Sequence, residues 1–67
     1  MKLNYDKETD SLYIDLSTRA STDSREISKD IVLDFDEDGV IVGIDIQHAS
    51  TNLDLKTIEV ESLPIPA

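Results

Sequence analysis

Carboxylates between residues 34 and 45 have the spacing of a calcium-binding loop. The pattern consists of Asp34, Asp36, Asp38, Gly39, Ile41 and Asp45. Oxygen donors at positions one, three, five and twelve, with glycine at six and an aliphatic residue at eight, are typical of an EF-hand loop that binds Ca²⁺. The residue types therefore offer divalent-cation binding as one hypothesis.

The residues around this loop argue against a true EF hand. An EF-hand loop lies between two helices, whereas both flanks here alternate as strands. In a hairpin with a four-residue loop, Asp34 faces Ile41, and Asp45 then lies about 13 Å further along its strand. One ion needs its oxygens within about 2.6 Å. We therefore expect an acidic hairpin tip, and the alternative is a weak divalent-cation site formed by Asp34, Asp36 and Asp38.

His48 lies close in sequence to Asp45 and Ser50, which suggests hydrolase chemistry. A catalytic triad, however, is defined by mutual geometry and an oxyanion hole rather than by sequence proximity. No nucleophile elbow is present, and 67 residues cannot enclose a deep cavity and still keep a core. We expect a loop or interface histidine, and an enzyme only if two subunits form the site together.

The elements that must position these residues are strands. Residues 2–5, 11–16, 31–35 and 40–46 alternate apolar and polar side chains, so each strand has one buried and one wet side. A weaker strand is expected around residues 25–28 and a last one at 57–61, followed by an extended tail at 62–67. The expected inward residues are Leu3, Tyr5, Leu12, Ile14, Leu16, Ile31, Leu33, Phe35, Val40, Val42, Ile44 and Ile46.

The Asp-Gly pair before Val40 is the strongest turn signal in the chain. If the loop has four residues, Phe35 faces Val40. If only the Asp-Gly pair forms the turn, Phe35 faces Val42. Both registers keep apolar residues opposite one another, whereas a slip by one residue would turn Asp34 inward.

These elements predict a mainly β fold, bordering on α+β, in one small domain of residues 1–67. It is an antiparallel β-meander of about five to six short strands, with one short helical turn after residue 49. Ser50 or Thr51 is expected to cap this turn, which runs through Lys56. Such a turn covers only part of the apolar face, which needs a second layer. The sheet either curls over the helical turn or packs against a second copy. Because small domains without disulfides or structural metals often associate with a second chain, we expect a homodimer.

The net charge and the cysteine content limit the classes of ligand that this chain can bind. There are 15 acidic and 6 basic side chains, which gives a net charge of −9, and no cysteine. This charge argues against nucleic acid and anionic membranes as direct ligands, and the absence of cysteine excludes disulfides and Cys-rich zinc sites. The N-terminal residues lack the apolar region of a signal peptide, so we expect a cytoplasmic protein. No cofactor is indicated.

The outer face of the predicted sheet carries apolar residues among carboxylates. These residues are Tyr13, Asp15, Val32, Asp34, Ile41 and Asp45, and Gly43 lies on the same face. A small apolar patch ringed by carboxylates is suited to a basic protein partner. The alternative is that one or two of the apolar residues pack under the C-terminal segment.

Two stretches carry a resemblance to a known family. Residues 5–14, YDKETDSLYI, and residues 31–50, with an acidic strand, an Asp-Glu-Asp-Gly turn and a Val-Gly-Ile core, are similar to domain of unknown function family 2283, a group of small, mostly bacterial proteins. The family has no defined activity or site residues. In size and context its members resemble the products of small genes found beside toxin genes, which implies an antitoxin-like role. Typical antitoxins also bind DNA, but this chain has no basic patch.

The sequence thus favours a protein-interaction module that binds a basic protein, and the resemblance implies an antitoxin-like form of it. The alternatives are the weak cation site at residues 34–38 and an enzyme whose site forms between subunits and involves His48.

Overall fold

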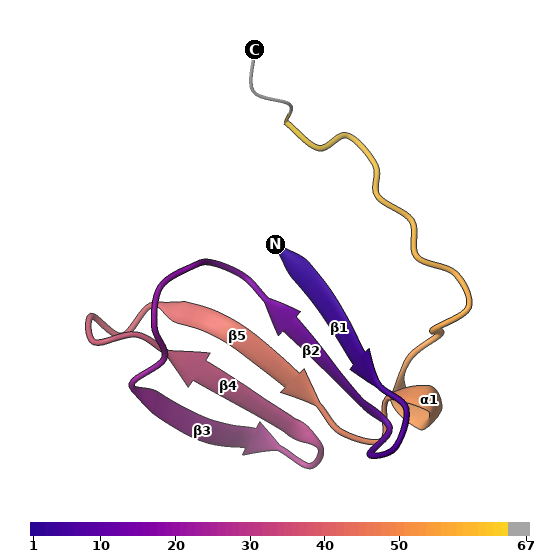
Figure 1. Cartoon of the computed structure of the whole chain (residues 1–67), viewed down its shortest axis with the longest axis horizontal. Helices are drawn as coiled ribbons and strands as arrows, with labels where there is room; N and C mark the ends of the chain where they lie inside the picture. Colours follow the sequence, from indigo (N-terminus) through magenta and orange to yellow (C-terminus); the bar gives the residue numbers. More distant parts are fainter. Residues whose placement is uncertain (65–67) are drawn as a thin grey trace.

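The computed structural model describes residues 1–64 and contains one antiparallel sheet and one short helix (Figure 1). The strand order is β1-β2-β5-β4-β3. This confirms the mainly β, antiparallel fold with one short helical turn close to residue 49. The elements are β1 (Lys2–Asp6), β2 (Ser11–Asp15), β3 (Asp23–Ser28), β4 (Ile31–Phe35), β5 (Ile41–Ile46) and α1 (Ala49–Asn52).

The sheet joins a hairpin, β1–β2, to a three-stranded meander, β3–β4–β5. After β2 the chain crosses to the far edge of the sheet, so β2 pairs with β5 rather than with the strand that follows it (Figure 1). The amide of Leu16 donates to the carbonyl of Val42 at 2.9 Å, and that of Thr22 donates to the carbonyl of Phe35 at 2.8 Å. These bonds fix both ends of the crossover connection.

The register of β4 and β5 decides between the two predicted alternatives. Leu33 faces Ile44, as the shorter turn requires, so the four-residue-loop register is wrong. The register then shifts, and Phe35 faces Ile41 instead of Val42. Val42 is buried, whereas Val40, which was expected to point inward, is half exposed and precedes β5. The reason for the shift lies in the turn itself.

The turn between β4 and β5 is built on a buried carboxylate, that of Asp36, which is only 5% exposed. Its Oδ1 accepts the amides of Asp38 and Val40, both at 2.9 Å. Arg19 Nε lies 2.8 Å from Oδ2 as an ion pair. Gly39 has a φ of 79°, which favours glycine, and its amide donates to the Asp36 carbonyl at 3.1 Å. The side chain therefore shortens the loop and draws it toward the β2–β3 connection.

The core lies at one end of the sheet, where Leu12, Ile46 and Ala49 pack together. Ala49 opens α1 and its amide donates to the Asp10 carbonyl at 2.8 Å. The helix begins at Ala49 with His48 as its N-cap and no side-chain cap, so the expected cap at Ser50 or Thr51 is wrong. It ends at Asn52 rather than at Lys56. Four further residues pack partly buried against this cluster: Ile14, Ile31, Ile44 and Leu55.

The predicted last strand, at residues 57–61, is wrong. Asp54 accepts hydrogen bonds from the Lys56 amide at 3.1 Å and the Thr57 hydroxyl at 2.8 Å, which turn the chain. The segment then runs away from the sheet (Figure 1). Of the predicted tail, residues 62–64 belong to no strand, and 65–67 lie outside the described residues.

Replacing Asp36 tests the turn. Asp36→Ala removes the acceptor of two amides and the partner of Arg19, so we expect the free energy of unfolding to fall by about 1–3 kcal/mol. The measurement is urea denaturation followed by circular dichroism. Glu37→Ala, in the same turn but with an exposed side chain, is the control and should change stability by less than about 0.5 kcal/mol. Equal losses in both variants would refute this role of Asp36.

Candidate functional site

Five of the six residues predicted for the outer face come together on β2, β5 and β4. Strand pairing places Tyr13 beside Asp45, and Asp45 beside Val32. The neighbouring row runs from Asp15 through Gly43 to Asp34. Paired residues on adjacent strands share one face of a sheet. We call the surface formed by Tyr13, Asp15, Val32, Asp34, Gly43 and Asp45 the acidic face.

Ile41 does not belong to the acidic face. Its strand partner is Phe35, on the far side of the register shift. Phe35 in turn lies under the guanidinium of Arg25, whose Cζ is 4.2 Å from the ring centroid. The shift that Asp36 imposes thus removes Ile41 from the predicted set.

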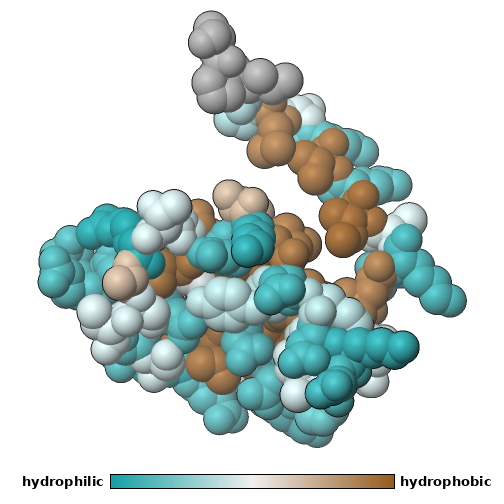
Figure 2. Space-filling view, in the orientation of Figure 1, coloured by the Kyte–Doolittle hydropathy of each residue, from teal (hydrophilic) through white to brown (hydrophobic). Residues whose placement is uncertain are grey.

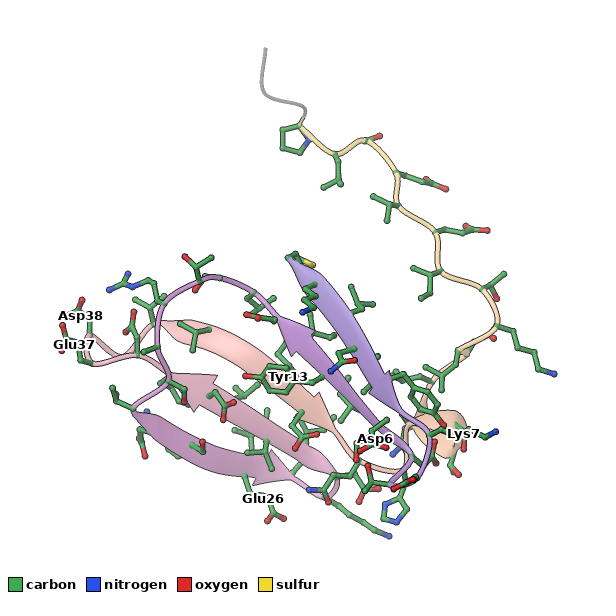
Figure 3. The ribbon with its side chains drawn as sticks, in the orientation of Figure 1. Asp6, Lys7, Tyr13, Glu26, Glu37 and Asp38 are labelled. Carbon is green, nitrogen blue, oxygen red and sulfur yellow. The ribbon has the colours of Figure 1, made fainter. Side chains whose placement is uncertain are left out.

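Tyr13 connects three strands across the acidic face. Its hydroxyl donates to Asp34 Oδ2 at 2.6 Å, so the side chain extends from β2 over β5 to β4. The other carboxylate oxygen, Oδ1, accepts from the hydroxyl of Ser24 on β3 at 2.5 Å. Figure 3 shows Tyr13 over the middle of the sheet. The Tyr13–Asp34–Ser24 chain of hydrogen bonds therefore links three strands, β2, β4 and β3, through side chains and passes over β5.

Gly43 makes room for this arrangement. A Cβ atom at residue 43 would lie 1.9 Å from the Tyr13 hydroxyl oxygen and 2.5 Å from the ring carbon that carries it. Both distances are far below van der Waals contact. Glycine is therefore needed here because the Tyr13 side chain crosses β5 directly above the backbone.

The hydrogen bond to Asp34 raises the pKa of Tyr13 from 10.0 to about 12, with further contributions from burial and from the negative charges of Asp34, Asp15 and Asp45. Each of these effects favours the neutral phenol, because ionisation would place a further negative charge among carboxylates. At neutral pH Tyr13 is consequently a fixed hydrogen-bond donor.

The carboxylates of the acidic face lack cationic partners within residues 1–64. The ion pairs of this part of the chain join Arg19 to Asp36 and Asp38, Arg25 to Asp23, and His48 to Asp30. Lys2 faces Asp15 in the register, but no ion pair joins them. The negative charge of Asp15 and Asp45 is therefore free to act on a ligand, and that of Asp34 is hydrogen-bonded to two neutral hydroxyls without being neutralised.

The three carboxylates proposed to bind a cation have other partners. Asp34 is engaged by Tyr13 and Ser24, and Asp36 and Asp38 both contact Arg19, the latter at 2.8 Å from Nη2. No group of three or more potential ligands that could hold a metal ion occurs within residues 1–64.

His48 also has a partner that the sequence does not indicate. Its Nδ1 lies 2.9 Å from Asp30 Oδ1, and Asn52 Nδ2 donates to the other oxygen at 3.1 Å. These hydrogen bonds lower the pKa of Asp30. The hydroxyl of Ser50 donates to Asp10 Oδ2 at 2.7 Å. The serine and the histidine of the hypothetical triad are thus hydrogen-bonded to different aspartates.

Three residues of this corner have left-handed backbone conformations. Asp10, Asp30 and His48 have φ values of 53°, 69° and 51°. Asp10 also accepts the hydroxyl of Tyr5 at 2.7 Å, and the bonds from Tyr5 and Ser50 lower its pKa. Positive φ values are uncommon outside glycine and are concentrated in Asn, Asp and His. Through Asp10 and Asp30, this corner hydrogen-bonds the β1–β2 turn and the β3–β4 turn to the beginning of α1 and its end.

A small single-layer antiparallel sheet with one acidic face defines the class of this protein. A family model described as "Protein of unknown function (DUF2283)" matches residues 2–50, and the chain belongs to this family. The match spans all five strands and leaves out residues 51–67. No curated protein and no solved structure matches the chain. Within residues 1–64, no helix has the length and apolarity needed to cross a membrane.

The pKa of Tyr13 can be tested directly. We expect its phenol to ionise near pH 12 and the Asp34→Asn variant to ionise at lower pH, because the negative charge of the acceptor is gone. The pKa is raised in the folded state, so its contribution to stability is complete below pH 10 and is lost between pH 10 and about 12. Phenolate absorbance measures this, and Tyr13→Phe separates the signal from that of Tyr5. A Tyr13 that titrates at pH 10 would contradict the hydrogen bond.

Gly43→Ala tests the close approach. The new methyl group displaces the Tyr13 ring, so we expect the free energy of unfolding to fall by about 1–3 kcal/mol. In a Tyr13→Ala background the same substitution should cost little, because nothing then crosses β5. A double-mutant cycle from denaturation curves gives the coupling between the two positions, and additive effects would show that the ring is not seated over residue 43.

Proposed function

We propose that this protein is an interaction module whose acidic face binds a basic protein partner. The observation that carries the proposal is the set of three carboxylates, Asp15, Asp34 and Asp45, around Tyr13 without a cationic partner in residues 1–64. A net charge of −9 adds long-range attraction for a cationic protein.

The chemistry of the acidic face favours arginine and lysine side chains as ligands. A carboxylate can accept two parallel hydrogen bonds from one guanidinium, and an aromatic ring can stack against it. Tyr13 is held by Asp34 and supported by Gly43, so binding costs little side-chain ordering. A partner that inserts arginines between Tyr13 and Asp45 would neutralise charges that otherwise repel one another.

The family resemblance supports a specific form of this proposal. Neutralisation of a basic toxin requires a soluble, acidic binding protein, and the acidic face meets that requirement without DNA binding. We place this activity in the cytoplasm, where a chain without cysteine needs no oxidising environment.

The test uses the isotope-labelled protein and a synthetic arginine-rich peptide. Titration followed by NMR should shift the amide signals of residues 13, 15, 43 and 45 more than those of the hairpin tip at 37–38. Asp15→Asn combined with Asp45→Asn should raise the dissociation constant by about tenfold, since both charges lie within the proposed contact. Higher ionic strength should weaken binding.

The control removes the same charge elsewhere. Glu8→Gln with Glu37→Gln alters two exposed side chains in the loops and should change the dissociation constant by less than about twofold. Equal weakening by both pairs of substitutions would mean that net charge alone attracts the peptide, which would refute the acidic face as the site. The same variants can then be tested for binding to any small basic protein whose gene lies beside the gene for this chain.

A further inference from the structure

A segment beyond the core carries an unpartnered strand pattern. We define residues 57–63 as the C-terminal arm. Ile58 and Val60 alternate with Glu59 and Glu61, and the two apolar side chains are 65% and 66% exposed. Figure 2 shows hydrophobic groups along one side of the arm and hydrophilic groups along the other. No hydrogen bond joins residues 58–64 to the sheet. The arm thus has the pattern of a strand without the pairing of one.

The edge strand β1 offers a matching pattern. Leu3 and Tyr5 face Ile14 and Leu12 in the register, so they belong to the apolar face. They are nevertheless 45% and 44% exposed. β1 pairs only with β2, and its other edge is open. An open edge of this kind is a template for a further strand.

We propose that a second copy of this chain covers the apolar face and that the C-terminal arm of each copy pairs along β1 of the other. In this dimer Ile58 and Val60 extend the apolar row of Leu3 and Tyr5. The two apolar faces form the two layers that a sheet needs. Exchange of an identical segment is a low-cost route to a dimer.

Charge selects β1 over the other edge strand, β3. β1 carries Lys2 and Asp6, so its charges balance, and Lys2 has no ion pair within residues 1–64. β3 carries Asp23, Arg25 and Glu26, and its one cation, Arg25, already lies 3.5 Å from Asp23. The arm has Glu59 and Glu61 on its polar side, so Lys2 of β1 attracts it, whereas the net negative charge of β3 does not.

The side chains that the dimer would cover are exposed in the single chain. Leu3 and Tyr5 on β1 are 45% and 44% exposed, and Ile58 and Val60 on the arm are 65% and 66% exposed. Within its own chain the arm is directed away from the sheet by the turn at Asp54.

Sedimentation over a range of concentrations tests the dimer. The intact chain should sediment as a dimer, and Ile58→Ser with Val60→Ser should raise its dissociation constant about tenfold or more, because two apolar contacts are lost. The control exchanges the same residues, Ile58→Val with Val60→Ile, which keeps composition and alternation and should leave the dimer nearly unchanged. A chain that is monomeric at all concentrations, or a dimer equally stable in the serine variant, would overturn the proposal.

Cross-linking tests the exchange of arms. Because the chain has no cysteine, Leu3→Cys in one preparation and Val60→Cys in another introduce one thiol each. Mixing them under oxidising conditions should give a disulfide-linked heterodimer, visible by mass spectrometry. A chain with both substitutions should link between copies. A disulfide formed only within one chain would show that the arm folds onto its own β1 and would overturn the proposal.

The dimer and the proposed basic partner use opposite faces of the sheet, so either can fail alone. Asp15→Asn with Asp45→Asn should leave the sedimentation of the dimer unchanged. In the variant Ile58→Ser with Val60→Ser, addition of the peptide should still shift the NMR signals of residues 13, 15, 43 and 45. A loss of both properties in the acidic-face variant would overturn this separation of the two surfaces.

Discussion

The constraint on which the rest of this structure depends is that one sheet has two faces and the chain is too short to cover either. The dimensions of 33 × 31 × 19 Å are those of a single layer. α1 protects one end of the apolar face through Ala49, and no large side chain in the described part of the chain is completely buried. Hydrophobic burial alone therefore contributes less here than in a two-layer domain, and side-chain hydrogen bonds hold the ends and the middle of the sheet.

Polar contacts supply three such ties, and each joins elements that are distant in sequence. Asp36 fastens the β4–β5 turn to the connection after β2 through Arg19. Tyr13 links β2 to β4 across Gly43. Asp30 holds His48 at the beginning of α1. These carboxylates have structural roles, whereas Asp15 and Asp45 remain without partners in residues 1–64, which is why the acidic face is the candidate for recognition.

Alternation in the sequence predicts β2, β4 and β5 well because each is at least partly buried on one face, and burial determines register wherever one face is apolar. β1 and β3 are exposed along their whole length. Alternation still predicts β1, whereas β3 is expected only from residue 25. The strand predicted at residues 57–61 does not form in the single chain. Alternation indicates that a segment is suited to pairing in a sheet, but it does not indicate whether the partner strand lies in the same chain. The bond between Tyr13 and Asp34 was missed because it depends on the strand order β2-β5-β4, which local patterns do not contain. The sequence leaves Asp36 in an acidic hairpin tip, with cation binding as the alternative, because nothing near it in sequence points to Arg19.

The pairing of β2 with β5 has a consequence for synthesis on the ribosome. Leu12 of β2 pairs with Ile46 of β5, which is synthesised much later. The N-terminal hairpin therefore leaves the ribosome with the β2 edge unpaired, before β3, β4 and β5 have formed. An isolated two-stranded hairpin is barely stable in water, and unpaired edges invite aggregation during such delays. The acidic composition counteracts this hazard, because nascent chains of the same sign repel one another before the sheet closes.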